Sequence, residues 1–559
     1  MFRSLLLAAT FLTPLGAQAQ GVAGPYLAAR IAGFSNDYTA AGAYYGQLLR
    51  ADEATPQVQE NAIIIFSVLG DFDAAVRAAD KLEASNRPSQ FSANARMVVA
   101  LRDGDTETAR AQLEGDGVGG ALLDGLLAAW IDAEAGETSA ALEAFDAMAA
   151  TESFAPFAWT HKAYLLAQAG DFEGADDILS GRAHGPLSAN TRAIMAHAQV
   201  LVQIDRRDDA LDLLEQANEA TNSPMLQDLQ ARIEAGEDVP YDFIATPKDG
   251  MAEAYFTLAA LLAGESSTTF TLLNARAATV LRPDHVDALV LTADLLESQG
   301  QHDLAAAALT AVPQGDPAFF GAEIARAEVL LESGKDDAAV EVLLALTRSH
   351  GERQEVWAAY ADALRRLDRF APAADAYDKA IALLPEVEAR NWYLVYARGI
   401  VRERLGDWTG AEADFREALE LNPDQPNVLN YLGYGLVEQR LKLDEALSMI
   451  EQAVEARPDD GYITDSLGWV LYRLGRYEEA VAPMEKAVEL RPLDPLINDH
   501  LGDVYWIVGR KREAEFQWKR ALSLDPEEQV ERIERKLEVG LDVVLEEEGG
   551  TGPIEAADN

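Results

Sequence analysis

The chain has 559 residues, too many for one ordinary globular core, so several domains or a repetitive solenoid are expected. Its formal net charge of −48 disfavours nucleic acid and anionic lipid as partners, because both are themselves negatively charged. The sequence contains no cysteine, which excludes disulfides, a cysteine nucleophile, thiolate metal ligands and a lipid-modified cysteine. We attribute the acidity to solubility in preference to a dedicated site for a basic partner.

Residues 1–19 have the pattern of a secretory signal peptide. Arg3 supplies a positive charge, an apolar run extends from Leu5 to Leu12, and the small-x-small sequence at 17–19 provides a cleavage site. The apolar run is shorter than the roughly 20 residues of a membrane-spanning helix, and no later segment contains a run of that length. We therefore expect an exported, soluble, periplasmic protein without an integral membrane segment in the mature chain.

A degenerate repeat runs through residues 20–239. Six turn residues recur at intervals of 32 to 35 residues, and an alanine follows each of them five residues later. The pairs are Asn36 and Ala41, Gly70 and Ala75, Gly104 and Ala109, Gly136 and Ala141, Gly170 and Ala175, and Asp205 and Ala210. A fixed period of this length indicates one supersecondary unit used repeatedly, so about six helical hairpins are predicted here.

The repeat loses its register at residues 240–251. Pro240 and Pro247 lie there in a stretch without helical periodicity. We interpret it as a linker or a kink between two halves of a solenoid.

Eight tandem units with a stronger repeat follow over residues 252–528. Three sets of residues recur 34 or 35 positions apart in the last four units. They are Gly399, Gly433, Gly468 and Gly502; Ala411, Ala446, Ala480 and Ala514; and Pro423, Pro458, Pro492 and Pro526. The small residues allow two helices to pack closely and the proline ends the second helix, so each unit is predicted to be a helical hairpin. The predicted units are 252–285, 286–319, 320–353, 354–387, 392–425, 426–460, 461–494 and 495–528.

Residues 529–559 are predicted to contain a capping helix and an acidic disordered tail. Five apolar residues after the last proline fall on one face of a helix, namely Val530, Ile533, Leu537, Leu541 and Val544. The end of a solenoid requires such a helix, because the last hairpin otherwise leaves its apolar face uncovered.

A unit of about 34 residues with two helices, small residues at their contact and a closing proline is similar to the tetratricopeptide repeat (TPR). The resemblance implies an all-α fold: a TPR superhelical solenoid of antiparallel helix pairs in two halves, with a C-terminal capping helix. The two-part organisation and the block at 430–480 also resemble large exported bacterial envelope TPR proteins. One such relative is an outer-membrane lipoprotein that binds and activates a carboxy-terminal processing protease and delivers peptidoglycan hydrolases to it. This chain lacks the cysteine that would carry the lipid anchor.

The sequence shows no catalytic or metal-binding motif in a suitable context. Residues 115–120 satisfy G-x-G-x-x-G, but a helical pattern precedes them and no strand–helix–strand alternation surrounds them, so a loop between helices is the preferred interpretation. The seven histidines are scattered without a metal-ligand spacing. Acidic pairs such as Asp176–Asp177 lie at turns and helix starts, where carboxylates stabilise the helix dipole. We therefore predict a protein that is not an enzyme and needs neither a cofactor nor a metal.

The resemblance also implies a concave groove lined by the first helix of each unit, through its positions 2, 5, 9 and 12. Aromatic side chains beside Asn and Asp at such positions are typical of a peptide-binding surface. The predicted partner-binding residues are Tyr393, Tyr396, Asn430, Tyr434, Asp465, Trp469, Tyr472, Arg473, Asp499, Asp503 and Trp506. Some aromatic residues could instead pack between helices; we assign that role to Trp518 and favour the groove for Trp469 and Trp506. Because position 5 carries Asp465 and Asp499, a basic or neutral segment suits the groove better than a free carboxylate.

These observations lead to three hypotheses for the function. The preferred one is a non-enzymatic periplasmic scaffold or adaptor for protein–protein interactions, which presents cell-wall hydrolase substrates to a carboxy-terminal processing protease. The alternative is a structural or assembly component of envelope biogenesis, in outer-membrane, polysaccharide-export or cell-wall machinery. An enzyme is the third and least supported. Capture of a protease, capture of a membrane partner, or turnover by the purified protein alone would distinguish them.

Overall fold

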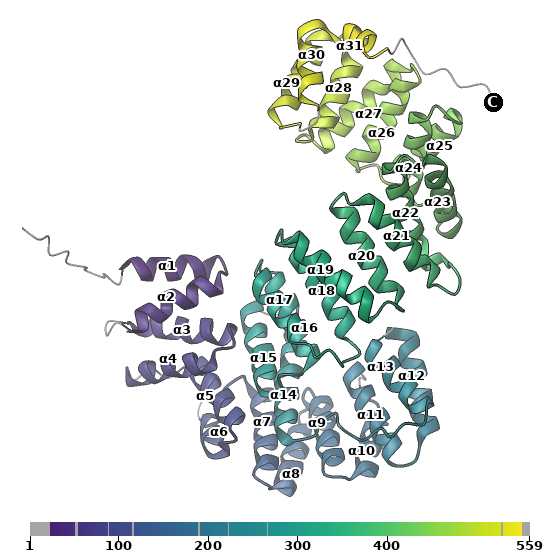
Figure 1. Ribbon diagram of the computed structural model, residues 1–559. Coiled ribbons are helices and arrows are strands. Elements are labelled where there is room, and N and C mark those ends of the chain that lie inside the picture. Colours follow the sequence, from purple (N-terminus) through teal and green to yellow (C-terminus); the bar gives the residue numbers. More distant parts are fainter. Residues whose placement is uncertain are drawn as a thin grey trace, which may run out of the picture. The chain divides into compact units, whose positions relative to one another are not determined.

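The computed structural model describes residues 23–50, 54–85, 87, 89–114, 117–187, 190–221, 223–264, 267–526 and 529–549. These residues form 31 α-helices and one short 3₁₀ helix, and within these ranges there is no β-strand (Figure 1). The all-α fold expected from the sequence is confirmed. The predicted signal peptide at 1–19 and the tail from 550 onward lie outside the described residues. None of the helices in the described ranges is long and apolar enough to cross a membrane.

The chain divides into two compact units between Ala339 and Val340. The helices of the first unit are α1 (Ala23–Phe34), α2 (Tyr38–Arg50), α3 (Pro56–Val68), α4 (Phe72–Ala84), α5 (Gln90–Asp103), α6 (Thr106–Gln112), α7 (Ala121–Glu134), α8 (Thr138–Ala149), α9 (Ala155–Gln168), α10 (Phe172–Leu179), α11 (Thr191–Gln203), α12 (Arg207–Thr221), α13 (Pro224–Glu234), α14 (Pro247–Leu262), α15 (Thr268–Leu281), α16 (Val286–Glu297), α17 (His302–Thr310) and α18 (Phe319–Glu332). The division falls within α19 (Asp336–Ser349).

The second unit is also entirely helical in its described residues. Its helices are α20 (Gln354–Arg366), α21 (Phe370–Ala382), η1 (Ala389–Asn391), α22 (Trp392–Arg404), α23 (Trp408–Leu421), α24 (Pro426–Glu438), α25 (Leu443–Ala456), α26 (Gly461–Arg473), α27 (Tyr477–Leu490), α28 (Pro495–Ile507), α29 (Lys511–Ser523), α30 (Val530–Val539) and α31 (Leu541–Glu547).

Six helical hairpins, from α1–α2 to α11–α12, open the first unit. Each turn contains one residue in the left-handed region, where the chain can reverse directly after a helix. These residues are Asn36, Gly70, Gly104, Gly136, Gly170 and Asp205, the six turn residues noted in the sequence. The alanine that follows each turn is fully buried, because the second helix of the hairpin packs closely there. An aspartate after the glycine can cap that second helix: Asp71 Oδ1 accepts the N–H of Ala74 at 2.9 Å.

Helix α14 begins at Pro247, inside the stretch 240–251 that the sequence predicts as a linker. Thr246 and Asp249 form a reciprocal capping box: the Asp249 carboxylate accepts the Thr246 N–H at 2.8 Å, and Thr246 Oγ1 accepts the Asp249 N–H at 3.4 Å. Pro247 occupies the first helical turn, where its missing N–H costs nothing. The linker prediction is therefore corrected from Pro247 onward, because capping residues start a helix there without a hydrophobic repeat.

Helices α14 and α15 pack back onto the N-terminal hairpins. Helix α14 contacts α5, α7 and α9, and α15 contacts α3 and α5; Figure 1 shows α14 beside α7. Two cations fix this arrangement at helix C-termini, where the helix dipole favours positive charge. Lys248 Nζ donates to the carbonyl of Arg102 in α5 at 3.1 Å, and Arg276 Nε donates to that of Val68 in α3 at 3.0 Å. Residues 240–251 thus lie inside the first unit, and the division of the chain falls about 90 residues further on.

The second unit shows why its repeat keeps small residues. A Cβ atom on Gly468 would lie 2.6 Å from Met484 Cγ, and one on Gly502 would lie 2.4 Å from Trp518 Cδ1. The paired helices therefore approach too closely for a side chain at these positions. The one extra residue of unit 426–460 is accommodated in the turn before α25, where Lys442 adopts a positive φ of 45°.

The end of the chain forms two capping helices where the sequence predicts one. Helix α30 ends and α31 begins at Gly540, whose φ is 90°. A Cβ atom there would lie 2.5 Å from Trp506 Cζ2. Both the positive φ and the nearby indole require glycine at this position. Because Gly540 interrupts the helix, the cap consists of two helices and not of the single helix predicted.

Candidate protein-binding surface

The predicted partner-binding residues lie on α22, α24, α26 and α28, the first helices of four hairpins in the second unit. Their exposure to solvent differs widely. Tyr393 is exposed; Asn430, Tyr434, Trp469, Arg473 and Trp506 are half-buried; Tyr396, Asp465, Tyr472, Asp499 and Asp503 are buried. Only part of the predicted set is therefore open to a partner.

Large apolar side chains are exposed on all four of these helices. We call them the exposed row: Tyr393, Tyr431, Tyr462 and Leu496, each between 39% and 53% exposed. Tyr462 and Leu496 occupy position 2 of their units, as Tyr393 does. The groove positions of the repeat therefore indicate all three residues. Tyr431 occupies none of the four groove positions, so the repeat pattern did not predict that it would be exposed.

Tyr393 and Tyr431 are held by neighbours that limit their motion. The Tyr396 ring lies 6.4 Å from the ring of Tyr393 and 5.7 Å from that of Tyr431, between centroids. Arg365 Nη2 donates to the Tyr393 hydroxyl at 3.0 Å. Burial raises the pKa of Tyr396, which therefore acts as a neutral aromatic support between two exposed tyrosines.

Arginines at the ends of second helices lie beside the row. The Arg491 guanidinium carbon is 4.9 Å from the centroid of the Tyr462 ring, within cation–π distance. Arg457 Nη1 donates to Asn427 Oδ1 at 3.2 Å. The surface at Tyr462 thus combines an aromatic face with the guanidinium group of Arg491, a combination common at protein interfaces.

The Trp469 side chain is half-buried and stacks against neighbouring rings of the second unit. Its ring lies 4.0 Å from the His500 ring and 4.9 Å from the Tyr472 ring, with both pairs nearly parallel. Arg473 Nη1 donates to Glu438 Oε1 at 3.0 Å, and the Trp469 indole N–H lies 3.4 Å from the same oxygen. Burial, followed by Glu438, raises the pKa of the nearby half-buried Tyr434.

Asp465 does not face an open groove as expected. Its carboxylate is buried and accepts a bond from His500 Nδ1 at 3.0 Å. His500 belongs to the next first helix, α28, so this position makes a contact between successive hairpins. Burial opposes a charge on His500, but Asp465, together with Asp499 and Asp503, outweighs it and raises the pKa of the imidazole.

Asp499 and Asp503 likewise face the chain itself. Lys536 Nζ of α30 donates to Asp499 Oδ2 at 2.8 Å and to Asp503 Oδ1 at 2.6 Å, and all three side chains are almost fully buried. The Trp518 indole N–H donates to Asp503 Oδ1 at 2.9 Å, and Trp518 is buried as expected. The prediction of open carboxylates at these positions is corrected, because the capping helix supplies their cation.

Trp506 is covered by the same cap. Its indole N–H donates to Asp542 Oδ2 of α31 at 3.0 Å, and Lys511 Nζ lies 4.3 Å from its ring centroid. Its ring centroid is 5.2 Å from that of Trp518. Trp506 therefore packs between the last hairpin and the cap, and the groove assignment for it is less well supported than that for Trp469.

Two buried histidines should give the two units opposite dependences of stability on pH. In the first unit, burial lowers the pKa of His161 to about 4, so unfolding takes up a proton as the pH falls below about 6.5, and about 3 kcal/mol of stability is lost by about pH 4. In the second unit the pKa of His500 is raised. The stability that the His500–Asp465 contact contributes is complete below about pH 6.5 and is lost as the pH rises through the raised pKa of His500.

Hydrogen exchange measures both effects once it is corrected for the intrinsic effect of pH on exchange. On acidification from about pH 7.5 to about pH 5, we expect protection of α7–α9 to fall and protection of α26–α28 to hold or rise. His500→Gln should reduce the pH dependence of α26–α28, leaving the part due to Asp499, and should leave α7–α9 unchanged. An equal loss of protection in both groups of helices would contradict the assignment.

Comparison with known families identifies the repeat. Models described as tetratricopeptide repeat match residues 272–318, 296–363, 392–425 and 436–495. Together with the stacked hairpins, these matches show that the all-α chain contains TPR helical repeats over the matched ranges. No group of three or more His, Cys, Asp or Glu side chains in the described ranges could hold a metal ion.

Among known proteins, the chain is similar to the TPR repeat-containing protein PA4667 of Pseudomonas aeruginosa, with 31% identity over 159 residues. That match covers 28% of this chain and 26% of the relative, so it spans about a quarter of the relative's length.

Three solved structures share helical repeats with this chain at low identity. A TPR protein from Parabacteroides merdae is 18% identical over 46% of this chain and 98% of its own, with a TM-score of 0.39. One chain of the APC/C hetero-tetramer Cut9–Hcn1 is 15% identical over 94% of this chain and 97% of its own, with a TM-score of 0.39. YrrB, described as a TPR protein with an unusual peptide-binding site, is 21% identical over 35% of this chain and 100% of its own, with a TM-score of 0.28.

Proposed function

We propose that the protein is a non-enzymatic scaffold that binds a protein partner on the exposed row of its second unit. The observation that supports this most directly is the exposure of large apolar side chains on four successive first helices of a strongly acidic chain. Supported tyrosines beside arginines are typical of residues that contribute most to interface affinity, because they bury a large area with little loss of conformational freedom. The net charge disfavours nucleic acid as a partner.

We also propose where this scaffold acts. The signal-peptide pattern at 1–19 supports export to the periplasm. The resemblance of residues 430–480 to envelope TPR proteins supports a role beside a carboxy-terminal processing protease, to which the scaffold presents cell-wall hydrolase substrates. The protease role rests on the resemblance, whereas the scaffold role rests on the exposed row.

The test is a binding measurement with the purified periplasmic carboxy-terminal processing protease of the same host. We expect the variant Tyr393→Ala/Tyr462→Ala to weaken binding by at least about 30-fold, as for the loss of an interface hot spot of 2 kcal/mol or more. The scaffold should also accelerate cleavage of a cell-wall hydrolase by that protease, and the variant should not.

Phe516→Ala is the matched control, because Phe516 is an aromatic residue that is 63% exposed but lies on α29, a second helix. It should bind the protease like the wild type. If the protease does not bind at all, the protease role is wrong, and a membrane-assembly partner lost in the tyrosine variant would then favour the alternative. Equal effects of the tyrosine and Phe516 variants on every partner would remove the exposed row as the site.

A further inference from the structure

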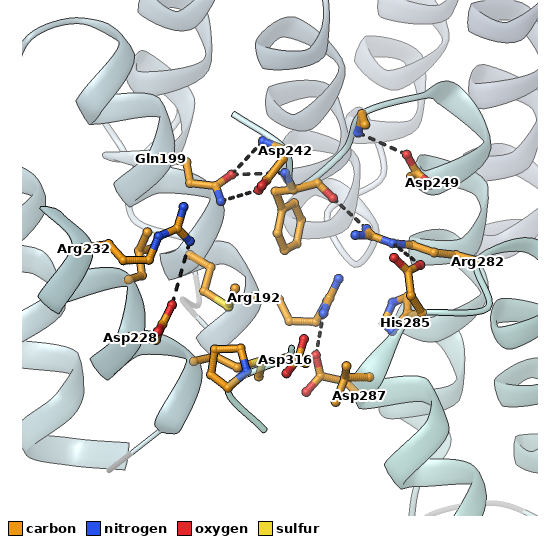
Figure 2. A pocket seen from close by; sticks show the side chains of 18 residues that line it. Arg192, Gln199, Asp228, Arg232, Asp242, Asp249, Arg282, His285, Asp287 and Asp316 are labelled. Atoms are coloured by element: carbon orange, nitrogen blue, oxygen red, sulfur yellow. Dashed lines mark hydrogen bonds and ion pairs between the residues drawn. The ribbon is translucent and has the colours of Figure 1, made fainter. Parts of the chain in front are cut away.

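A cavity of about 510 Å³ lies within the first unit, far in sequence from the exposed row (Figure 2). Its walls come from α11, α13, the segment 242–249, the start of α16 and the loop before α18. This is the region where the regular hairpin register is interrupted and α14 turns back onto the N-terminal hairpins.

The walls of the cavity are held in place by hydrogen bonds between distant segments. Gln199 Nε2 donates to Asp242 Oδ1 at 2.6 Å, and Gln199 Oε1 accepts the N–H of Phe243 at 3.1 Å. Arg282 Nη1 donates to the Phe243 carbonyl at 2.8 Å. The segment 242–249 is therefore fixed from both sides, and the cavity is pre-formed.

Two of the three arginines that line the cavity, Arg192 and Arg282, are firmly engaged. Arg192 donates to Glu253 through Nε and Nη2, and its Nη1 lies 2.5 Å from Asp287 Oδ2. Its guanidinium carbon is 4.7 Å from the centroid of Phe243. Arg282 is bound to a carbonyl as described, with its Nε 3.4 Å from Asp284. Neither guanidinium group is free to bind an anion, and the third, Arg232, lies 3.8 Å from Asp228 and 3.5 Å from Glu237, so a phosphate or carboxylate ligand is disfavoured.

The cavity carries more carboxylates than these arginines can balance, since six aspartates and three arginines line it. Asp316 is half-buried and accepts the Ala318 N–H at 2.8 Å, but no cationic side chain in the described part of the chain forms an ion pair with it. Burial, together with Asp287, Asp228 and Asp284, raises the pKa of Asp316. Asp242 and Asp249 are taken up by hydrogen bonds to Gln199 and Thr246, whereas Figure 2 shows Asp316 and Asp287 close together at the half-enclosed space.

The remaining wall is apolar. Met195 of α11, Met225 and Leu229 of α13, and Val286 of α16 line the cavity beside the carboxylates. A ligand that satisfies both kinds of wall needs a positive charge for the carboxylates and a flexible hydrocarbon chain for the methionine, leucine and valine side chains.

We propose that this cavity binds a primary ammonium or guanidinium group carried on an aliphatic chain, such as a lysine or arginine side chain or a polyamine. The charge replaces the cation that Asp316 lacks, and the aliphatic part covers the apolar wall. The proposal goes beyond the scaffold function, because this cavity and the exposed row share no residue.

The test is a ligand-observed NMR titration of the full chain, after removal of the predicted signal peptide, with spermidine and with acetyl-Gly-Lys-Gly-amide. Physiological ionic strength screens the general attraction of a strongly acidic surface. We expect saturable binding of at least one probe and none of the neutral acetyl-Gly-Gln-Gly-amide. Spermidine alone would indicate a free polyamine, and the tripeptide alone would indicate a basic side chain of a protein. Absence of saturable binding by both probes overturns the proposal.

Asp228→Asn/Asp316→Asn should weaken binding at least about tenfold, because it removes partly buried charges that the ligand would pair with. The asparagine side chain can still accept the Ala318 N–H, and relief of repulsion should keep or raise the thermal unfolding temperature. Asp208→Asn/Glu215→Gln is the matched control, since it removes the same charge from exposed positions of α12. Equal weakening by both double variants would show non-specific attraction and overturn the site. The tyrosine variant of the exposed row should bind the probes normally, so this test can fail independently of the scaffold function.

Discussion

We expect Lys536→Met to destabilise the C-terminal end of the second unit by about 3–5 kcal/mol, because it leaves buried carboxylates without their cation. The Lys536 ammonium is fully buried and donates to both Asp499 and Asp503. Arg532 Nη1 is the next cation, at 3.8 Å and 3.6 Å from these carboxylates. Burial and the neighbouring Asp503 already raise the pKa of Asp499, so the site tolerates little further loss of positive charge.

The measurement is hydrogen exchange over α28 to α31 combined with urea unfolding, because hairpins of a repeat array can open locally. Lys519→Met is the control: the Lys519 side chain is 64% exposed and pairs only with Glu515 on the same helix, so a change below about 0.5 kcal/mol is expected. Adding Asp499→Asn and Asp503→Asn to Lys536→Met should recover part of the loss. Equal protection in the two lysine variants would show that the buried ammonium does not hold the cap.

Glu253→Gln should destabilise the first unit by about 3 kcal/mol, because it removes one partner of a buried ion pair. Burial alone would raise the pKa of Glu253, but Arg192 and His285 outweigh it and hold that pKa well below its usual range. The Glu253 carboxylate accepts bonds from Arg192 at 2.5 Å and from His285 Nε2 at 3.2 Å. Without it, the Arg192 guanidinium keeps only Asp287.

Urea unfolding and hydrogen exchange over α11, α14 and α16 would measure this effect. Glu237→Gln is the matched control in the same unit, since Glu237 is 56% exposed and lies 3.5 Å from Arg232; a change below about 1 kcal/mol is expected. Replacing both Arg192 and Glu253 by methionine should cost less than Glu253→Gln alone, because the only carboxylate that then loses its partner is Asp287, whose side chain is 28% exposed to solvent. A loss in Glu237→Gln as large as that in Glu253→Gln would refute a special role for the buried pair.

The hairpins themselves were predictable because their signals are local. A glycine such as Gly70 turns the chain, Asp71 caps the next helix, and Ala75 allows close packing, all within six residues. These interactions are the same wherever the hairpin lies in the array, so one repeated pattern is enough to predict it.

The candidate surface was predictable only where the exposure of a residue depends on its own hairpin. Position 2 of a unit identifies exposed residues such as Tyr393 and Tyr462, because the start of a first helix projects outward whatever follows it. Position 5 failed at Asp465 and Asp499, because its surroundings depend on the next helix in the stack. Whether a cation such as His500 or Lys536 reaches it is decided by the packing of successive hairpins.

The sequence by itself determined the helical class, the hairpin repeat with its turns, and the acidic character of the chain. These follow from interactions within about 35 residues and from composition. Only the tertiary structure decided that α14 and α15 pack on α3, α5, α7 and α9, that Lys536 is buried between Asp499 and Asp503, and that a cavity lies between α11 and α16. Each depends on how hairpins far apart in sequence lie relative to one another, and a repeat pattern contains no information about contacts between units that it treats as equivalent.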